Sequence, residues 1–326
     1  MTPTLTRRGF AAAALAFGAA FAAPASAEPK MDRVHFLIPG GAGGGWDGAA
    51  RGVGEALVNA GLVGNASFEN MSGGGSGKAM VYMIDNARSN HGTLMVNSTP
   101  MIIRGLNGEV EQTFRDMTPV ASMLGDYAAL VVSSGSDINT FQDFLDAYKA
   151  NPNAVAVGGG SVPGGMDHLV ASLVLKAAGL PPLDVKYIPY DTGGPAMAAL
   201  LSGEIKALST GFSEAIEMAK AGEVKILGVT ARERLAEFPD VPTFAEQGAE
   251  MEFVNWRGFF AVPGLPEGER AAYEALLAEV LDTDAWEEVR ARNGWLTIHN
   301  GGADFVSFLE AQEAEMQALM TELGFL

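Results

Sequence analysis

Short apolar runs alternate with amphipathic helical patterns along most of the chain, and this alternation constrains the fold more than any other feature. Runs typical of strands occupy 35–38, 93–96, 128–132, 154–157, 185–188, 226–230 and 259–262. Apolar residues at helical spacing lie between them, as at 141–148, 273–281 and 305–323. This order predicts an α/β protein with mainly parallel sheets. No repeat or long linker interrupts it, so two domains would have to be joined through ordered strands.

Glycine gathers where the predicted strands meet the following helices. Four clusters occupy 39–51, 69–78, 158–168 and 190–195, and a weaker one occupies 209–213. A helix N-terminus carries unpaired N–H groups and a partial positive charge, and glycine lets the backbone approach a ligand closely. Several N-termini around one cleft would bind carboxylates without buried lysine or arginine. A tight connection would account for any single loop, whereas four together favour an anion site built from backbone dipoles.

Charge and composition exclude several classes of function. The 326 residues include 21 Lys and Arg against 39 Asp and Glu, which gives a formal net charge of −18. This balance excludes a nucleic-acid-binding role. There is no cysteine, so disulfides, thiolate nucleophiles and cysteine-ligated metals are absent. The four histidines are too scattered to form a local ligand motif, and neither a metal site nor a cofactor is predicted.

The N-terminus has the features of a twin-arginine export signal. Residues 6–10 read Thr-Arg-Arg-Gly-Phe, 11–23 are apolar apart from one glycine, and 25–27 are Ala-Ser-Ala. The apolar stretch is shorter than the roughly 20 residues of a transmembrane helix. We therefore expect a signal peptide at 1–27, cleavage after Ala27, and a soluble periplasmic protein.

Known nucleotide-binding and catalytic motifs match the sequence poorly. Residues 43–48 match G-x-G-x-x-G, but Asp47 would place a carboxylate against a bound pyrophosphate. Lys78 is followed by Ala79, where a phosphate-binding loop needs Ser or Thr, and neither Ser76 nor Ser161 fits a nucleophile elbow. An exported cofactor-binding α/β oxidoreductase remains as the alternative to a binding protein.

The glycine loops, taken with one further segment, resemble a known family. The loop at 39–51, Glu-Asn-Met-Ser-Gly-Gly-Gly at 69–75, Gly160-Ser161 with His168, the segment 190–201, and Phe-Pro-Asp-Val-Pro-Thr at 238–243 occur in a single order. Together they resemble the extracytoplasmic solute-binding receptors of the tripartite tricarboxylate transporter family, also called the Bug family. Residues 43–47 and 255–260 are similar to its tricarboxylate-binding branch. Many other members carry Thr-Asp where this chain has Trp46-Asp47, a departure that bears on the substrate.

The resemblance implies a periplasmic-binding-protein type II fold, with two α/β domains, a ligand cleft between them and two crossing strands. The crossings are expected near 128–132 and 255–260. Domain 1 would combine 28–131 with 257–326, and domain 2 would comprise 132–256. The ligand would be a small di- or tricarboxylate, with citrate favoured, which the receptor, a monomer, delivers to the membrane permease.

The predicted ligand-binding residues come from all the glycine-rich loops and from one crossing strand. They are Gly41, Ala42, Gly43, Gly44, Gly45, Trp46, Asp47, Ser72, Gly74, Ser76, Ser98, Ser161, His168, Asp191, Thr192, Gly193, Thr210 and Arg257.

Four of these residues have side chains whose roles stay open. Asp47 would cap its helix and order loop amides or water, because a direct contact with a carboxylate would be repulsive. Trp46 would pack on the ligand or under the loop. His168 would act as a base or, preferably, cap its loop. Arg257 would bind a third carboxylate or form a hinge salt bridge.

Overall fold

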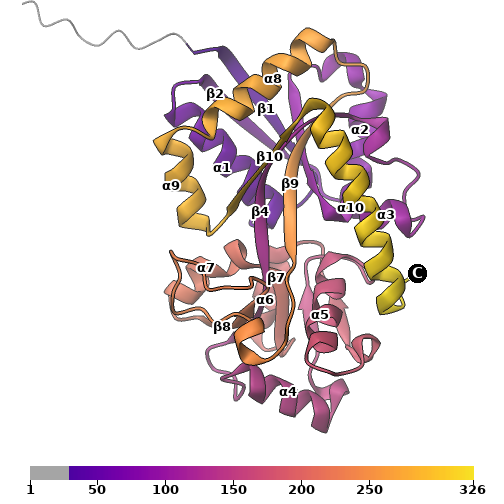
Figure 1. The fold of residues 1–326 in the computed structure, drawn as a ribbon, viewed down its shortest axis with the longest axis vertical. Helices are drawn as coiled ribbons and strands as arrows, with labels where there is room; N and C mark the ends of the chain where they lie inside the picture. Colours follow the sequence, from indigo (N-terminus) through magenta and orange to yellow (C-terminus); the bar gives the residue numbers. More distant parts are fainter. Residues whose placement is uncertain (1–28) are drawn as a thin grey trace, which may run out of the picture.

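The chain forms two α/β lobes joined by two long strands. The structure is a computed structural model, which describes residues 29–326, so the predicted export signal and its cleavage site lie outside the described residues. Figure 1 shows one lobe carrying α1–α3 and α8–α10 and the other carrying α4–α7, with β4 and β9 running between them. The α/β class and the periplasmic-binding-protein architecture are confirmed.

The strands are β1 Met31–Ile38, β2 Val63–Asn70, β3 Thr93–Ser98, β4 Thr118–Ser133, β5 Val157–Gly159, β6 Tyr187–Pro189, β7 Ala207–Gly211, β8 Val224–Val229, β9 Val254–Ala261 and β10 Leu296–Gly301. The helices are α1 Gly45–Asn59, α2 Gly77–Asp85, α3 Thr99–Leu106, α4 Phe141–Ala150, α5 Met166–Ala177, α6 Gly193–Ser202, α7 Phe212–Lys220, α8 Glu267–Val280, α9 Asp284–Asn293 and α10 Gly302–Leu323. Among residues 29–326, no helix is both long enough and apolar enough to cross a membrane.

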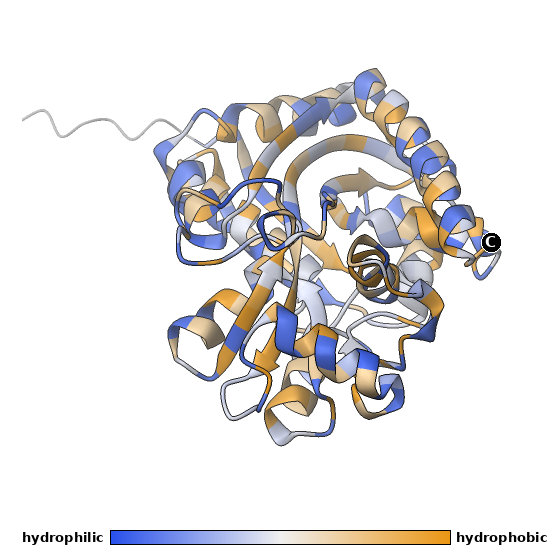
Figure 2. Cartoon of the chain, turned by 60° about the horizontal axis from the view of Figure 1, so that its bottom comes forward, coloured by the Kyte–Doolittle hydropathy of each residue, from blue (hydrophilic) through white to orange (hydrophobic). Residues whose placement is uncertain are grey.

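In the first lobe a parallel core is extended by antiparallel strands. β1 lies between β2 and β3 with parallel pairing, β9 pairs antiparallel with β3, and β4 pairs antiparallel with β9 and β10. Phe36 of β1 packs on Phe259 of β9 with ring centroids 5.4 Å apart. In Figure 2, helix α10, which ends at the C mark, alternates between hydrophilic and hydrophobic colours. Its Phe305 and Leu309 are fully buried, as expected for an amphipathic helix that covers the sheet.

The second lobe repeats this plan on a smaller scale. β5 lies between β6 and β7 with parallel pairing, and both β7 and β8 pair antiparallel with β4. Helix α4 begins at a capping box in which Thr140 and Asp143 exchange hydrogen bonds, and it buries Phe141 and Phe144, as the sequence predicts. The expectation of mainly parallel sheets is wrong at the centre of the molecule. The chain crosses to the second lobe on β4 and returns on β9, so these neighbouring strands run in opposite directions.

β4 changes partners where it passes from one lobe to the other. Tyr127 is the last residue paired with β9, opposite Val254, and Ala128 is the first paired with β7. We propose that the chain passes from the first lobe to the second at Tyr127–Ala128 and returns to the first lobe just before Val254. The sequence-based boundaries at 131/132 and 256/257 remain predictions, within a few residues of these positions.

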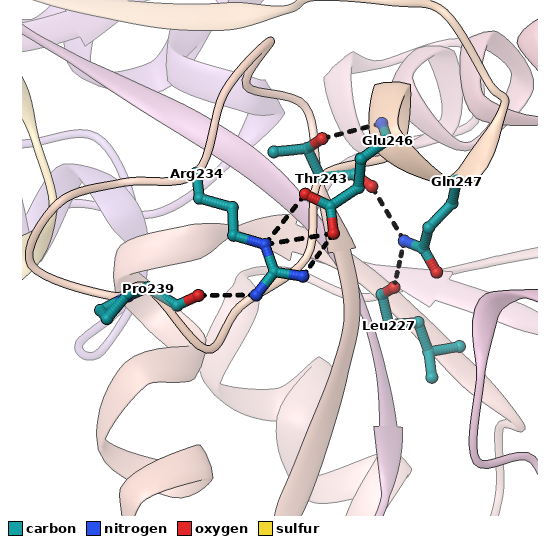
Figure 3. Close-up of polar contacts among 6 residues, drawn as sticks. All are labelled: Leu227, Arg234, Pro239, Thr243, Glu246 and Gln247. Carbon is teal, nitrogen blue, oxygen red and sulfur yellow. Dashed lines mark hydrogen bonds and ion pairs between the residues drawn. The ribbon is translucent and has the colours of Figure 1, made fainter.

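The segment between β8 and β9 contains the Phe-Pro-Asp-Val-Pro-Thr run and is held by a polar network, drawn in Figure 3. Arg234 Nε donates to both carboxylate oxygens of Glu246, at 2.9 and 3.1 Å, and its Nη1 donates to the Pro239 carbonyl at 2.7 Å. Gln247 Nε2 donates to the carbonyl of Leu227, in β8, at 3.0 Å. This network fixes the loop on β8.

Candidate functional site

A cavity of about 150 Å³ lies between the two lobes. The first lobe lines it with the loops after β1, β2 and β3, and the second lobe with the loops after β5 and β6 and with Glu214 of α7. Asn255 and Arg257 of the crossing strand β9 complete the wall. Ligands of open α/β sheets bind outside the carboxyl ends of parallel strands, and the five strands that precede these loops all belong to the two parallel cores.

The structure brings most of the predicted site residues to this cavity. Those lining it are Gly41, Gly44, Gly45, Trp46, Ser72, Gly74, Ser98, Ser161, Asp191, Thr192, Gly193 and Arg257. Those outside its lining are Ala42, Gly43, Asp47, Ser76, His168 and Thr210. The glycine clusters therefore located the backbone of the cavity, while several side chains next to it have other roles.

Asp47 organises the first loop. Its Oδ2 accepts the Gly43 amide at 3.0 Å, and its Oδ1 accepts Arg51 Nε at 2.8 Å and Asn70 Nδ2 at 3.0 Å. The carboxylate thus faces the loop amide and a neighbouring strand, in line with the ordering role expected for it. The first-turn amides of α1, from Gly45 onward, have no partner within the helix and are left for a ligand.

Trp46 and Ser98 are bonded to each other. Trp46 Nε1 donates to Ser98 Oγ at 2.9 Å, while both residues line the cavity. The bond ties the N-terminus of α1 to the end of β3. Trp46 therefore anchors the loop and forms part of the cavity wall, and its packing on a ligand stays a prediction.

His168 caps its loop. Its Nδ1 accepts the Gly164 amide at 2.9 Å, and its ring stacks on Tyr187 with centroids 4.6 Å apart. Burial lowers the pKa of His168 to about 4, so the ring is neutral at physiological pH. Since His168 does not line the cavity, its assignment as a ligand residue is not supported. The capping role preferred in the sequence analysis matches this geometry.

The two lobes touch across the cavity. Ser72 Oγ, after β2, donates to Asp191 Oδ2, after β6, at 2.6 Å. A Cβ at Gly41 would stand 2.8 Å from Thr192 Cγ2, so only glycine permits this approach of the loops. The structure is thus a closed arrangement, and Ser72 bonds to the opposite lobe.

Arg257 is surrounded by acids that the sequence analysis missed. Its Nη2 lies 3.5 Å from Asp126 Oδ2, and both side chains are buried. Asp126 also accepts Ser213 Oγ at 2.7 Å. Asp167 of α5 and Glu214 of α7 line the cavity nearby. Arg257 therefore has the hinge ion pair considered for it and also lies on the cavity wall.

Burial determines the protonation of these acids. Desolvation raises the pKa of Asp167 to about 7 and that of Glu214 to about 8, while the charge of Arg257 opposes both shifts. Desolvation likewise raises the pKa of Asp126, against the effect of Arg257. One weak signal existed in the sequence. Asp167 lies inside the third glycine cluster, and Glu214 directly follows the fifth.

A second arginine lies on the first-lobe side. Arg104 of α3 lines the cavity and pairs with Glu109 at 2.7 Å. Its side chain packs on Gly75, where a Cβ would stand 2.6 Å from Arg104 Cδ. Nothing in the sequence marked Arg104, because its approach to the loop after β2 arises only from the packing of α3.

Two α/β lobes, a cavity between them and two crossing strands are the architecture of two-lobed solute-binding proteins. Comparison with known proteins identifies the family. Residues 59–325 match the model of the tripartite tricarboxylate transporter family receptor, and the chain belongs to this family. Its members are periplasmic solute-binding proteins and not enzymes. The oxidoreductase alternative is therefore rejected.

Individual relatives agree with this assignment. Protein BugT of Bordetella pertussis is 26% identical over 283 residues, which cover 85% of this chain and 85% of BugT. The structure of the periplasmic binding protein BugD matches with a TM-score of 0.80 at 19% identity, covering 91% of this chain and 98% of BugD. MatC from Rhodopseudomonas palustris, solved with bound malate, matches with a TM-score of 0.76 at 21% identity, covering 88% and 98%. These two structural matches support the fold.

Proposed function

We propose that this protein captures a small carboxylate in the periplasm and delivers it to the permease of a tripartite tricarboxylate transporter. The observation that carries the proposal is the cavity between the lobes, whose first-lobe wall is made of glycine loops and the N-terminus of α1. Unpaired amides at a helix N-terminus bind a carboxylate at contact distance, even in a protein with a strongly negative net charge. Malate in MatC supports a small carboxylate as ligand.

The number of carboxylates on the ligand depends on Arg257. The citrate-like preference expected from the sequence needs this guanidinium as the donor to a third carboxylate. Arg257 already pairs with Asp126, and Asp167 and Glu214 lie near it. A third carboxylate would compete with Asp126 for Arg257. We therefore propose a ligand with fewer carboxylates than citrate.

The route to the periplasm follows from the sequence pattern alone. We propose export through the twin-arginine signal at 6–10 with cleavage after Ala27, and a monomeric mature protein. N-terminal sequencing of the exported protein checks the cleavage site. Replacement of Arg7 and Arg8 by Lys is expected to leave the precursor in the cytoplasm.

Ligand binding tests the receptor function. The mature chain is unfolded and refolded to remove carried-over ligand, and thermal unfolding is then measured with succinate, malate, adipate, citrate, aspartate and glutamate. At least one carboxylate at a hundredfold excess over its Kd should stabilise the protein by about 2.7 kcal/mol. Calorimetry of the positive ligands gives the affinities. If no small carboxylate binds, the receptor proposal is wrong.

A further inference from the structure

The charges around the cavity do not balance. Its lining includes two arginines, Arg104 and Arg257, and three acids, Asp167, Asp191 and Glu214. Each arginine already has an acidic partner behind the wall, Glu109 or Asp126. Within residues 29–326, none of the three lining acids forms an ion pair with a basic side chain.

Two of the lining acids belong to the second lobe. Asp167 lies in the first turn of α5 and is 7% exposed, and Glu214 lies in the first turn of α7 and is partly exposed. The charges of Asp167 and Asp126 raise the pKa of Glu214, and the charge of Arg257 lowers it. Glu214 Oε1 lies 3.0 Å from the point where a Gly45 Cβ would stand, at the N-terminus of α1. The second-lobe wall therefore places carboxylates opposite the amides of the first lobe.

Three residues of the cavity lining carry an unpaired buried polar atom. Among residues 29–326, Thr192 Oγ1, Asn255 Oδ1 and Arg257 Nε have no hydrogen-bond partner, although the three residues are only 6%, 3% and 3% exposed. A buried polar atom without a partner is costly, so each of these atoms marks a position for a ligand atom or an ordered water. Asn255 Oδ1 is an acceptor and the Thr192 hydroxyl can accept or donate, so both can bind an N–H donor on the ligand.

We propose that the ligand carries a protonated amine in addition to its carboxylate. The carboxylate binds the first-lobe amides around Gly45, and the amine binds between Asp167 and Glu214. This inference rests on the proposed function only for the carboxylate group of the ligand. An organic cation suits the site better than a metal, because no group of three acids or histidines in the described part of the chain converges closely enough to hold a metal ion.

Electrostatics favours this ligand class over a dicarboxylate. Above a pH of about 8, where Asp167 and Glu214 are ionised, a dicarboxylate would bring two further negative charges beside these acids in a partly enclosed cavity. There the repulsion between like charges is stronger than in solvent. An amino-carboxylate adds no net charge, and its amine supplies the partner that Asp167 and Glu214 lack.

Matched ligand pairs test the inference on the wild-type protein. Calorimetry compares β-alanine with succinate, 4-aminobutanoate with glutarate, and L-glutamate with glutarate, at a pH of about 8.5. In the pair of fitting length, the amine-bearing member should bind at least about tenfold more tightly. If every dicarboxylate binds as tightly as its amine-bearing partner or more so, the inference is overturned while the receptor function stands. If no ligand of either kind binds, both proposals are overturned.

Charge-removing variants test the two acids. Asp167→Asn and Glu214→Gln keep the side-chain volume, and Glu217→Gln, at an exposed position of the same helix α7, is the matched control. Either cavity variant should raise the Kd of the amino-carboxylate about tenfold or more, without weakening the dicarboxylate, and the control should change neither. Equal losses for both ligands would assign the acids a structural role and overturn the amine site.

The pH dependence of ligand affinity in the wild-type protein tests the inference even if those variants do not fold. The charged groups facing Asp167 and Glu214 are Arg257 of β9 and Asp126 of β4, and Tyr187 of β6 stays neutral because its pKa is raised. Amino-carboxylate affinity should increase several-fold from a pH of about 6 to about 8.5, as the acids ionise. Dicarboxylate affinity should decrease over the same range. An amino-carboxylate affinity that falls with rising pH overturns the inference.

Discussion

Asp167 and Glu214 couple proton binding to folding. Both have pKa values raised by burial, from 3.8 to about 7 and from 4.5 to about 8. Between the unfolded and folded pKa values the folded state binds more protons, so the free energy of unfolding falls as the pH rises. His168 has the opposite effect below its ordinary pKa of 6.5, because burial lowers its pKa to about 4. Above a pH of about 6.5 the two acids therefore dominate among these three groups.

We predict that the ligand-free protein loses stability between a pH of about 6.5 and about 8. The slope for each acid can reach about 1.4 kcal/mol per pH unit, because one pKa unit corresponds to that free energy. Urea unfolding across this range measures the slope. Asp167→Asn and Glu214→Gln should each flatten it, and Glu217→Gln should not. A stability that stays constant or rises over this range in the wild type would contradict the burial of ionisable acids in the cavity.

At the scale of the element, the N-terminus of α1 offers a matched pair of glycines. A Cβ at Gly45 would stand 2.8 Å from Arg257 Cζ and 3.0 Å from Glu214 Oε1. A Cβ at Gly48, one turn further along the same helix, would meet nothing within 4 Å. The first position is needed for close packing against the hinge charges, and the second is not.

We predict that Gly45→Ala displaces Arg257 and reduces ligand affinity at least about tenfold, with a loss of stability of about 1 to 3 kcal/mol from overpacking. Gly48→Ala should leave affinity unchanged and stabilise the protein by up to about 1 kcal/mol, because alanine is the better helix former. Calorimetry and urea unfolding of the two variants give both quantities. Equal affinities for Gly45→Ala and Gly48→Ala would contradict the packing of α1 against Arg257.

The elements that the sequence predicts are those whose pattern is local. β1, β3 and β9 carry apolar runs and α4 carries its own capping box, so each element can be predicted from adjacent residues. β2 was missed because it is an edge strand on which only Val63 is buried. β7 was missed because it is short and includes Ser209 and Thr210.

The same distinction applies to the cavity. Glycine clusters after strands predict loop backbones, because the need for glycine is local. The meeting of Asp126, Asp167 and Glu214 around Arg257 depends on how β4, α5, α7 and β9 pack, which no local pattern records. Sequence reasoning thus located the glycine-rich wall of the cavity and missed the acidic side chains opposite.

At the scale of the whole molecule, the lobes are linked by more than the two crossing strands. Helix α10 belongs to the first lobe, yet Phe325 just beyond its end packs edge-on against His168 of α5, with ring centroids 4.9 Å apart. Lys176 of α5 also pairs with Glu322 of α10. The aromatic contact lies next to the cavity, because Asp167, which precedes His168, lines it. We expect opening of the cavity to separate Ser72 from Asp191.

We predict that the protein closes on its ligand by this motion. Small-angle scattering of the refolded, ligand-free protein should give a larger radius of gyration than the protein saturated with its ligand. Ser72→Ala removes the hydrogen bond between the lobes, which is 2.6 Å long, and should weaken binding by about 0.5 to 1.5 kcal/mol. The saturated variant should scatter like the saturated wild type, since the ligand still bridges the lobes. A radius of gyration that is the same with and without ligand would show that the closed arrangement persists in the free protein, and the hinge between Tyr127 and Ala128 would then have no part in capture.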